Sequence, residues 1–168
     1  MSLIPIVDAD DTIIEYVERN DWKPEQRYRV SALWVTNSQW EILLAQRSHT
    51  KKHHPLLWWP AVAGTVEKDE TYEQNIIKET EEELGIKNIS PVISHKTKTT
   101  SNYLHFTQWF TLTLDLPLDS FSLEESEVEQ LKWLTPWKLQ SDLLHYPERF
   151  VPWLSLVLPL FLPNSHNS

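Results

Sequence analysis

The chain has 168 residues, a formal net charge of −9 and no cysteine. This composition excludes disulfides, thiolate metal sites and cysteine nucleophiles, and the negative charge disfavours binding to nucleic acid by general electrostatics. The most apolar run, residues 150–163, is too short to span a bilayer, and the N-terminus does not have the pattern of a signal peptide. We therefore expect a cytoplasmic protein that binds neither membranes nor nucleic acid.

Strands and helices alternate along the chain, beginning with an N-terminal hairpin and connection over residues 1–26. Strands are expected over residues 3–7, 12–17, 27–36, 41–46, 61–67, 91–99, 103–116 and 128–134. A basic and aromatic loop is expected over residues 47–60. Helices are expected to begin at Thr71 and after Thr135, and a last one over residues 148–158. This pattern predicts one α/β domain over residues 1–163 with a mixed sheet, and a disordered tail at residues 164–168.

The helix that begins after Thr71 has strong end signals. Thr71 can cap the first turn, and Gln74, three residues on, completes a capping box. Gly85 suits a left-handed conformation at the other end. The helix is expected to bury a stripe formed by four residues, Ile76, Ile77, Thr80 and Leu84.

The opposite face of this helix carries three carboxylates. Glu79, Glu82 and Glu83 are spaced i, i+3, i+4, so their side chains share one helical face. Like charges at this spacing destabilise a helix unless a cation lies on them. Oxygen ligands favour a hard divalent ion, so the pattern predicts a Mg²⁺ or Mn²⁺ site.

The segment from Gly64 to Ile86 resembles the Nudix box, G-x5-E-x7-R-E-U-x-E-E-x-G-U, in which U is a bulky aliphatic residue. Seven of the nine defined positions match over 23 residues. The two departures are Lys78 in place of arginine and Thr80 in place of an aliphatic residue. The resemblance implies a Nudix-type α/β/α sandwich in which the box forms a loop–helix–loop.

The resemblance also implies an activity, the metal-dependent hydrolysis of a diphosphate linkage in a nucleotide or a nucleoside diphosphate joined to another group. Glu82 and Glu83 match metal-ligand positions, and Glu79 is either a further ligand or the general base. The carbonyl of Ala63 is a further expected metal contact. Glu127 is the expected ligand from a later loop, with Glu124 and Glu125 as alternatives.

Three other motif positions have expected supporting roles. Lys78 takes the place of an arginine that holds the base, and it is expected to anchor that base more loosely because lysine lacks the planar fork. Glu70 is expected to orient the loop or cap the helix. Gly64 is expected to let the backbone bend.

Substrate contacts are expected from Arg29, Arg47 and Trp59. The two arginines lie at positions that contact phosphates in this family, and surface salt bridging is the equal alternative. Trp59 can stack on a nucleobase. With nine tryptophans in the chain, packing in the core is the competing role for Trp59.

Segments outside the box resemble the branch of the family that includes isopentenyl-diphosphate isomerases. Those isomerases need a catalytic cysteine near Gly64, where this chain has Ala63 and Thr65. The expected activity is therefore hydrolysis of a small-molecule diphosphate. The alternatives are a non-catalytic nucleotide-binding module and, least favoured, an isoprenoid diphosphate isomerase. A homodimer is one oligomeric state left open.

Overall fold

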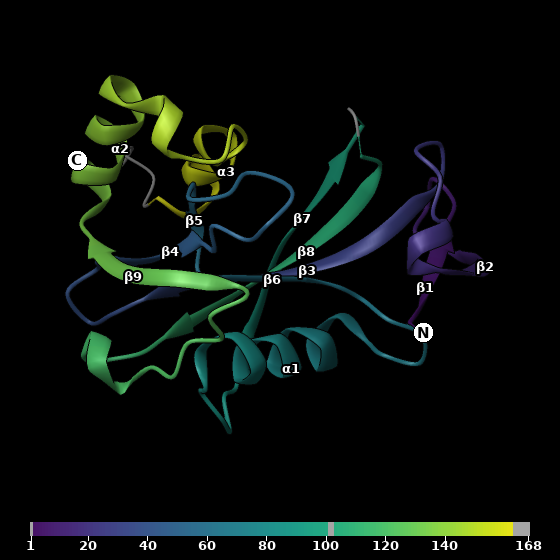
Figure 1. The fold of residues 1–168 in the computed structure, drawn as a ribbon, viewed down its shortest axis with the longest axis horizontal. Helices are drawn as coiled ribbons and strands as arrows, with labels where there is room; N and C mark the ends of the chain where they lie inside the picture. The colour runs from purple at the N-terminus through teal and green to yellow at the C-terminus, as the bar shows by residue number, and fades with distance from the viewer. Residues whose placement is uncertain (1, 101–102, 163–168) are drawn as a thin grey trace, which may run out of the picture. The chain divides into compact units, whose positions relative to one another are not determined.

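A computed structural model describes residues 2–100 and 103–162 (Figure 1). The expected tail at residues 164–168 lies outside this described part. The strands are β1 (Leu3–Val7), β2 (Ile13–Glu18), β3 (Arg27–Thr36), β4 (Ile42–Arg47), β5 (Trp58–Pro60), β6 (Val62–Thr65), β7 (Val92–Thr99), β8 (His105–Thr113) and β9 (Val128–Leu134). The helices are α1 (Tyr72–Leu84), α2 (Pro136–His145) and α3 (Leu154–Phe161). Among these, no helix is long and apolar enough to cross a membrane.

The chain forms two compact units. The first comprises Met1–Trp34 and Val62–Leu112, and the second comprises Val35–Ala61 and Thr113–Ser168. Strand β3 runs from the first unit into the second. Among the predicted site residues, Arg29 and the residues from Ala63 to Gly85 belong to the first unit, and Arg47, Trp59 and Glu127 belong to the second.

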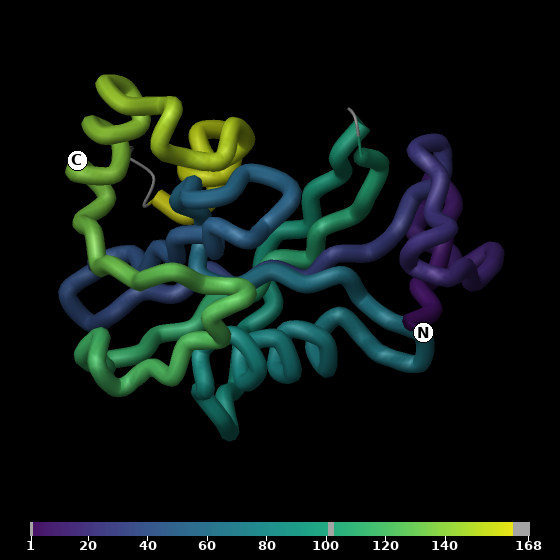
Figure 2. Tube along the Cα trace, in the orientation of Figure 1, coloured from purple at the N-terminus to yellow at the C-terminus, as the bar shows by residue number. Residues whose placement is uncertain are grey.

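In the first unit, the N-terminal hairpin leads into the sheet. Strands β1 and β2 pair antiparallel, and β1 continues onto the start of β3 through Ile6 with Tyr28 and Val7 with Arg27 (Figure 2). Strand β6 pairs antiparallel with β3, and β7 pairs antiparallel with β8. The core of this unit contains Ile6, Leu33, Val62, Val66, Ile76 and Leu84, all at 2% exposure or less.

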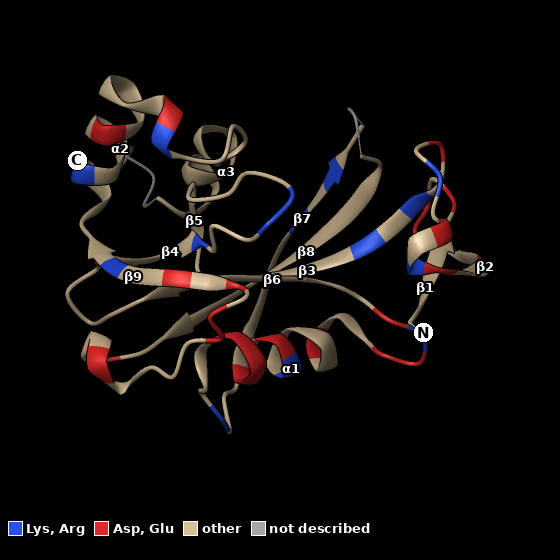
Figure 3. Cartoon of the chain, in the orientation of Figure 1, with Lys and Arg blue, Asp and Glu red and all other residues tan. Residues whose placement is uncertain are grey.

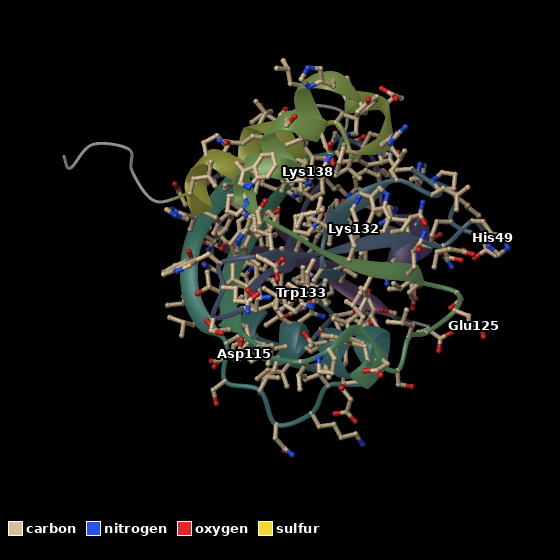
Figure 4. All side chains as sticks on the ribbon, turned by 90° about the vertical axis from the view of Figure 1, so that its left-hand side faces the viewer. His49, Asp115, Glu125, Lys132, Trp133 and Lys138 are labelled. Carbon is tan, nitrogen blue, oxygen red and sulfur yellow. The ribbon has the colours of Figure 1, made fainter. Side chains whose placement is uncertain are left out.

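In the second unit, strand β4 is paired on both sides. It pairs antiparallel with β5 and with β9, and an isolated parallel bridge joins Trp58 to Phe150. Lys132 on β9, labelled in Figure 4, places its Nζ 3.8 Å from the centroid of the Trp58 ring. Lys138 on α2 forms an i, i+4 ion pair with Asp142. The cation–π contact packs the stem of Lys132 over β5, so the lysine is part of the packing of this unit.

Helix α1 has the ends that its sequence predicts. The Thr71 side chain accepts from the Gln74 amide, and the Gln74 side chain accepts from the Thr71 amide, which completes the capping box. Gly85 has φ 70 and donates its amide to the carbonyl of Glu81. Helix α2 likewise has Thr135 as its N-cap and Pro136 at its first position.

The prediction of a helix over residues 148–158 is wrong at its start. Helix α3 begins only at Leu154. Phe150 is extended, with φ −121 and ψ 154, and Val151 donates its amide to the carbonyl of Trp58. Pairing with β5 therefore holds this segment extended, and Pro152 cannot donate the amide that a continuing helix would need. Residues 58–60, within the predicted loop, form a strand because they pair with β4.

His105 at the start of β8 gives the first unit a pH-dependent stability. Its Nδ1 lies 3.0 Å from Thr107 Oγ1, its ring lies 5.5 Å from the Tyr28 ring, and burial lowers the pKa of His105 to about 4. An unfolded histidine has a pKa near 6.5. The stabilising effect is therefore present above pH 6.5 and is lost as the pH falls from 6.5 through 4.

We predict that His105→Gln weakens this acid sensitivity. Between pH 6.5 and pH 4 the wild type should lose about 1–3 kcal/mol more unfolding free energy than the variant, measured by urea denaturation. Comparing the two proteins cancels the contributions of the other titrating groups. Parallel pH profiles for the two proteins would show that protonation of His105 is not coupled to folding.

Candidate functional site

The three carboxylates of α1 differ in their surroundings. Glu82 is exposed, Glu79 is partly buried, and Glu83 is only 3% exposed. Glu83 therefore lies toward the buried side, together with Thr80 and Leu84, and the prediction that all three carboxylates lie opposite the buried stripe is wrong for it. Figure 3 shows how acidic residues gather along α1 and the loop before it. The helix thus offers one solvated and two enclosed carboxylates.

Gly64 allows Glu79 to lie directly against the backbone of β6. A Cβ built at Gly64 would overlap Cγ and Cδ of Glu79 and lie 2.6 Å from its Oε1. Gly64 is paired with Ser31 and Ala63 with Ala32 in the regular ladder between β6 and β3. The expectation that Gly64 serves a backbone bend is therefore wrong: it lies within a strand, and its missing side chain makes room for a carboxylate.

Asn75 connects this carboxylate to the loop and to the sheet. Its Nδ2 donates to the carbonyl of Thr65 at 3.2 Å, to Oε2 of Glu70 at 2.9 Å and, more weakly, to Oε1 of Glu79 at 3.4 Å. Its Oδ1 accepts from the hydroxyl of Ser31. Asn75 is fully buried, so losing these partners would leave polar atoms without compensation.

Lys78 anchors the loop through Glu70. Its Nζ lies 2.6 Å from Oε1 of Glu70 and 3.5 Å from Oε2 of Glu67. Glu70 also accepts from the amide of Glu67. Burial acts to raise the pKa of Glu70, but the hydrogen bonds from Lys78, Glu67 and Asn75 lower it overall. The contacts of Glu70 with Lys78, Glu67 and Asn75 are consistent with the expectation that Glu70 orients the loop.

The electrostatics of Glu79 fit a cation. Burial raises the pKa of Glu79 to about 7; the charge of Lys78 opposes this shift, and the charge of Glu82 adds to it. A carboxylate that is costly to ionise beside another carboxylate would be stabilised by a divalent ion. Within residues 2–100 and 103–162, no three acidic or histidine side chains already stand as a metal-holding group. The oxygen donors fit Mg²⁺ or Mn²⁺.

Arg29, predicted to contact substrate, is engaged within the first unit. Its Nε lies 2.7 Å from Oδ1 of Asp11, and its guanidinium carbon lies 5.3 Å from the centroid of the Tyr72 ring. Its side chain is 18% exposed. Arg29 is therefore part of an ion-pair cluster with the turn between β1 and β2.

The remaining predicted residues belong to the second unit. The guanidinium carbon of Arg47 lies 4.4 Å from the centroid of the Trp59 ring, so one face of this ring is covered. Glu127 pairs with Lys51, with 2.5 Å between Oε2 and Nζ, and its carbonyl accepts from the amide of Ser48. These residues belong to the second unit, whereas the carboxylates of α1 belong to the first.

Sequence reasoning missed two residues, Asn75 and Asp11. Asn75 precedes Glu79 by four positions, so its place on the same helical face was a usable signal. A polar residue directly before the buried Ile76 was a second signal. Asp11 had no comparable signal, because its contacts come from strands and a helix far away in the sequence.

We predict that Gly64→Ala lowers the unfolding free energy by about 1–3 kcal/mol, the usual cost of overpacking. In a Glu79→Ala background the same substitution should cost much less, because the side chain that the new Cβ meets has been removed. Urea denaturation of the four proteins in this double-mutant cycle measures the interaction.

Gly85→Ala provides the control for loss of a glycine. Its cost should arise from the positive φ alone and should be unchanged by Glu79→Ala. If Gly64→Ala were equally costly with and without Glu79, the close approach of Glu79 would not be the reason for this glycine.

Comparisons with known proteins agree with this architecture. The family model for the NUDIX domain matches residues 25–154. Uncharacterized Nudix hydrolase YfcD of Salmonella typhi is 29% identical over 134 residues, which cover 79% of this chain and 72% of that protein. An isopentenyl-diphosphate Delta-isomerase of Salmonella paratyphi B is 27% identical over 125 residues, 72% of this chain and 69% of that protein.

Solved structures show the same fold. DR0079 from Deinococcus radiodurans superposes with a TM-score of 0.82 at 23% identity and covers 95% of this chain and 99% of its own. The ORF135 protein of Escherichia coli gives a TM-score of 0.55 at 26% identity, with 80% of this chain and 88% of its own covered. The fold is thus the Nudix α/β fold with a mixed sheet and three helices. With a family match that spans most of its length, this chain belongs to the Nudix hydrolase family.

Proposed function

We propose that this protein hydrolyses a diphosphate linkage in a nucleotide or a nucleoside diphosphate joined to another group, with Mg²⁺ or Mn²⁺ as cofactor. The observation that carries the proposal is the close packing of the Glu79 side chain against Gly64. Glu82 and Glu83 follow on the same helix at positions i+3 and i+4. Membership of the Nudix hydrolase family supports the reaction class.

The proposed roles follow from the surroundings of each carboxylate. Glu82 is exposed and can turn toward a bound cation, whereas Glu83 is buried and Glu79 lies against Gly64. The carbonyl of Ala63 and the carboxylate of Glu127 are proposed as further ligands. A divalent ion, when bound, would activate water and neutralise charge on the phosphoryl oxygens.

Glu79 is proposed either to ligate the cation or to accept the proton of the attacking water. In the reaction, water oxygen bonds to one phosphorus, the bond from that phosphorus to the bridging oxygen breaks, and that oxygen leaves with the other product. Asn75 and Gly64 would keep Glu79 at a fixed position in either role. Lys78 would act through Glu70, since its hydrogen bonds go to the loop carboxylates.

Proposed contacts to substrate come from Arg29, Arg47 and Trp59. Arg47 already lies over Trp59, so the pair could present a cation and an aromatic surface to the non-phosphate part of a substrate. The substrate class is a small-molecule diphosphate, and the identity of the joined group is left to an activity panel.

We predict that Glu82→Gln lowers metal-dependent turnover by at least about 100-fold. Mutating a residue that only hydrogen-bonds to a metal ligand already lowers metal affinity or activity by about 10–100-fold, and losing a ligand should cost more. Glu83→Gln should be as severe, but Glu82 is exposed and so gives the test that is least affected by folding. Product analysis over a panel of nucleoside diphosphate derivatives, with Mg²⁺ or Mn²⁺, measures the change.

Glu81→Gln is the matched control. Glu81 is exposed on the same helix, carries the same charge and pairs with Lys87 outside the motif. It should retain nearly full activity. If Glu82→Gln and Glu83→Gln both kept full activity as well, the assignment of the metal site to α1 would be wrong.

The alternative is a nucleotide-binding module without catalysis. One observation favours it: the hydrogen bonds of Lys78 go to Glu67 and Glu70, and none goes to the proposed base Glu79. Tight nucleotide binding without turnover of any compound in the panel would support it. Isomerase activity is the least favoured, since the chain lacks cysteine, and deuterium exchange into isopentenyl diphosphate would detect it.

A further inference from the structure

The turn between β1 and β2 directs one carboxylate into the protein. Asp8 orders the turn: its Oδ1 accepts from the amides of Asp10 at 2.9 Å and Thr12 at 3.0 Å. Asp11 follows with φ 64, a left-handed conformation that aspartate tolerates better than most residues. As a result the Asp11 side chain is only 11% exposed, whereas Asp10, one residue earlier, is exposed.

Three side chains from three elements converge on Asp11. Arg29 on β3 donates its Nε to Oδ1 at 2.7 Å and its Nη2 to the Asp11 carbonyl at 2.5 Å. The hydroxyl of Tyr72 on α1 donates to Oδ2 at 3.0 Å, and Lys96 on β7 forms an ion pair with the same oxygen. This geometry, with a guanidinium, an ammonium and a hydroxyl around one anion, is also what a phosphate group requires.

Two further basic side chains, Arg27 and Lys98, lie near the two that pair with Asp11, and Lys98 also interacts with the charge of Asp8 in the same turn. The Phe106 ring has three cations around it: its centroid lies 5.3–5.6 Å from the guanidinium carbon of Arg27 and from the Nζ atoms of Lys96 and Lys98. Arg27 precedes Arg29 by two residues on β3. Lys98 donates to the carbonyl of Ala9 in the same turn. Figure 3 shows the basic residues on β3 and β7. In the described part of the chain, the ion pairs of these four cations involve only Asp11.

Arg27 supplies an independent sign of an incomplete site. Its Nε is buried and has no hydrogen-bond partner within the described residues. A buried guanidinium donor without an acceptor costs free energy, and an anion with more acceptor oxygens than a carboxylate would satisfy it.

We propose that Arg29, Lys96 and Tyr72, with Arg27 and Lys98 beside them, form a phosphate-binding site that the Asp11 carboxylate fills as an internal ligand. Release of the β1–β2 turn would open the site to a phosphate ion or phosphate monoester. A phosphate carries up to two negative charges where Asp11 carries one, so it matches the surplus of cations more closely.

Apart from Arg29, which is also a proposed substrate contact, the site is distinct from the proposed metal site. Tyr72 is the first residue of α1 and precedes Glu79 by seven positions, about 10 Å along the helix axis. The first turn of this helix also adds its positive dipole end at Tyr72. Phosphate binding here does not depend on hydrolysis, so it can be tested in the absence of divalent metal.

The experiment compares inorganic phosphate binding by the full chain carrying Asp11→Asn with the wild type, by calorimetry in chelator at constant ionic strength. We expect Asp11→Asn to bind phosphate at least about 10-fold more tightly, because the competing carboxylate has been neutralised. Asp10→Asn removes the same charge from the same turn but at an exposed position, and it should behave as the wild type does.

Further variants locate the gained affinity. Adding Lys96→Met or Arg29→Met to Asp11→Asn should remove the gain. If Asp11→Asn binds no more tightly than Asp10→Asn, or if its gain survives the loss of both cations, the proposal is overturned.

A measurement on the wild type covers the case in which Asp11→Asn does not fold. Saturating phosphate should increase amide hydrogen exchange in residues 8–12, since the turn must leave the site, while chloride at equal ionic strength should not. Unchanged exchange in the turn at saturating phosphate would overturn the proposal in the same way.

Discussion

The arrangement of the site depends on one close approach, the packing of the Glu79 carboxylate against the backbone of Gly64. Only a strand position without a side chain can accept a helix carboxylate at this distance. Asn75 then ties the same carboxylate to the loop and, through Ser31, to β3. The helix, the loop and two strands are therefore positioned with respect to one acidic group, and a change at any of them would displace it.

Scarcity of glycine has consequences elsewhere in the chain. With only two glycines in the sequence, six non-glycine residues within the described ranges adopt positive φ, among them Asp11, Trp40 and Leu56. The free-energy cost of a positive φ is small for aspartate and larger for leucine and tryptophan. The glycines that are present are at positions where no other residue would serve equally well: Gly85 ends α1 in the left-handed region, and Gly64 accommodates Glu79.

Features that depend on neighbouring residues in the sequence could be predicted, whereas features that depend on contacts between distant residues could not. The capping box of Thr71, the end of α1 at Gly85 and the cap of α2 at Thr135 depend on neighbours a few positions away. The spacing of the Nudix box likewise predicted the fold. By contrast, the late start of α3 results from pairing of residues 150–151 with Trp58, more than ninety residues earlier. The burial of Glu83 and the contacts of Asn75 and Asp11 also depend on tertiary packing, for which local pattern gives little information.

Asp11 and Glu79, two partly buried carboxylates in the first unit, have pKa values shifted in opposite directions, although burial acts to raise both. Burial acts to raise the pKa of Asp11, but hydrogen bonds from Lys96 and Arg29 lower it overall, so the protein itself neutralises this charge. Burial raises the pKa of Glu79 to about 7, and the nearby Glu82 adds to the effect, since the charge of Lys78 offsets only part of it. A cation arriving from solution therefore gains most at Glu79 and little at Asp11, where it would have to displace an arginine and a lysine. An anion has the reverse preference. These charges support the proposed cation site at the middle of α1 and the proposed anion site at its first turn.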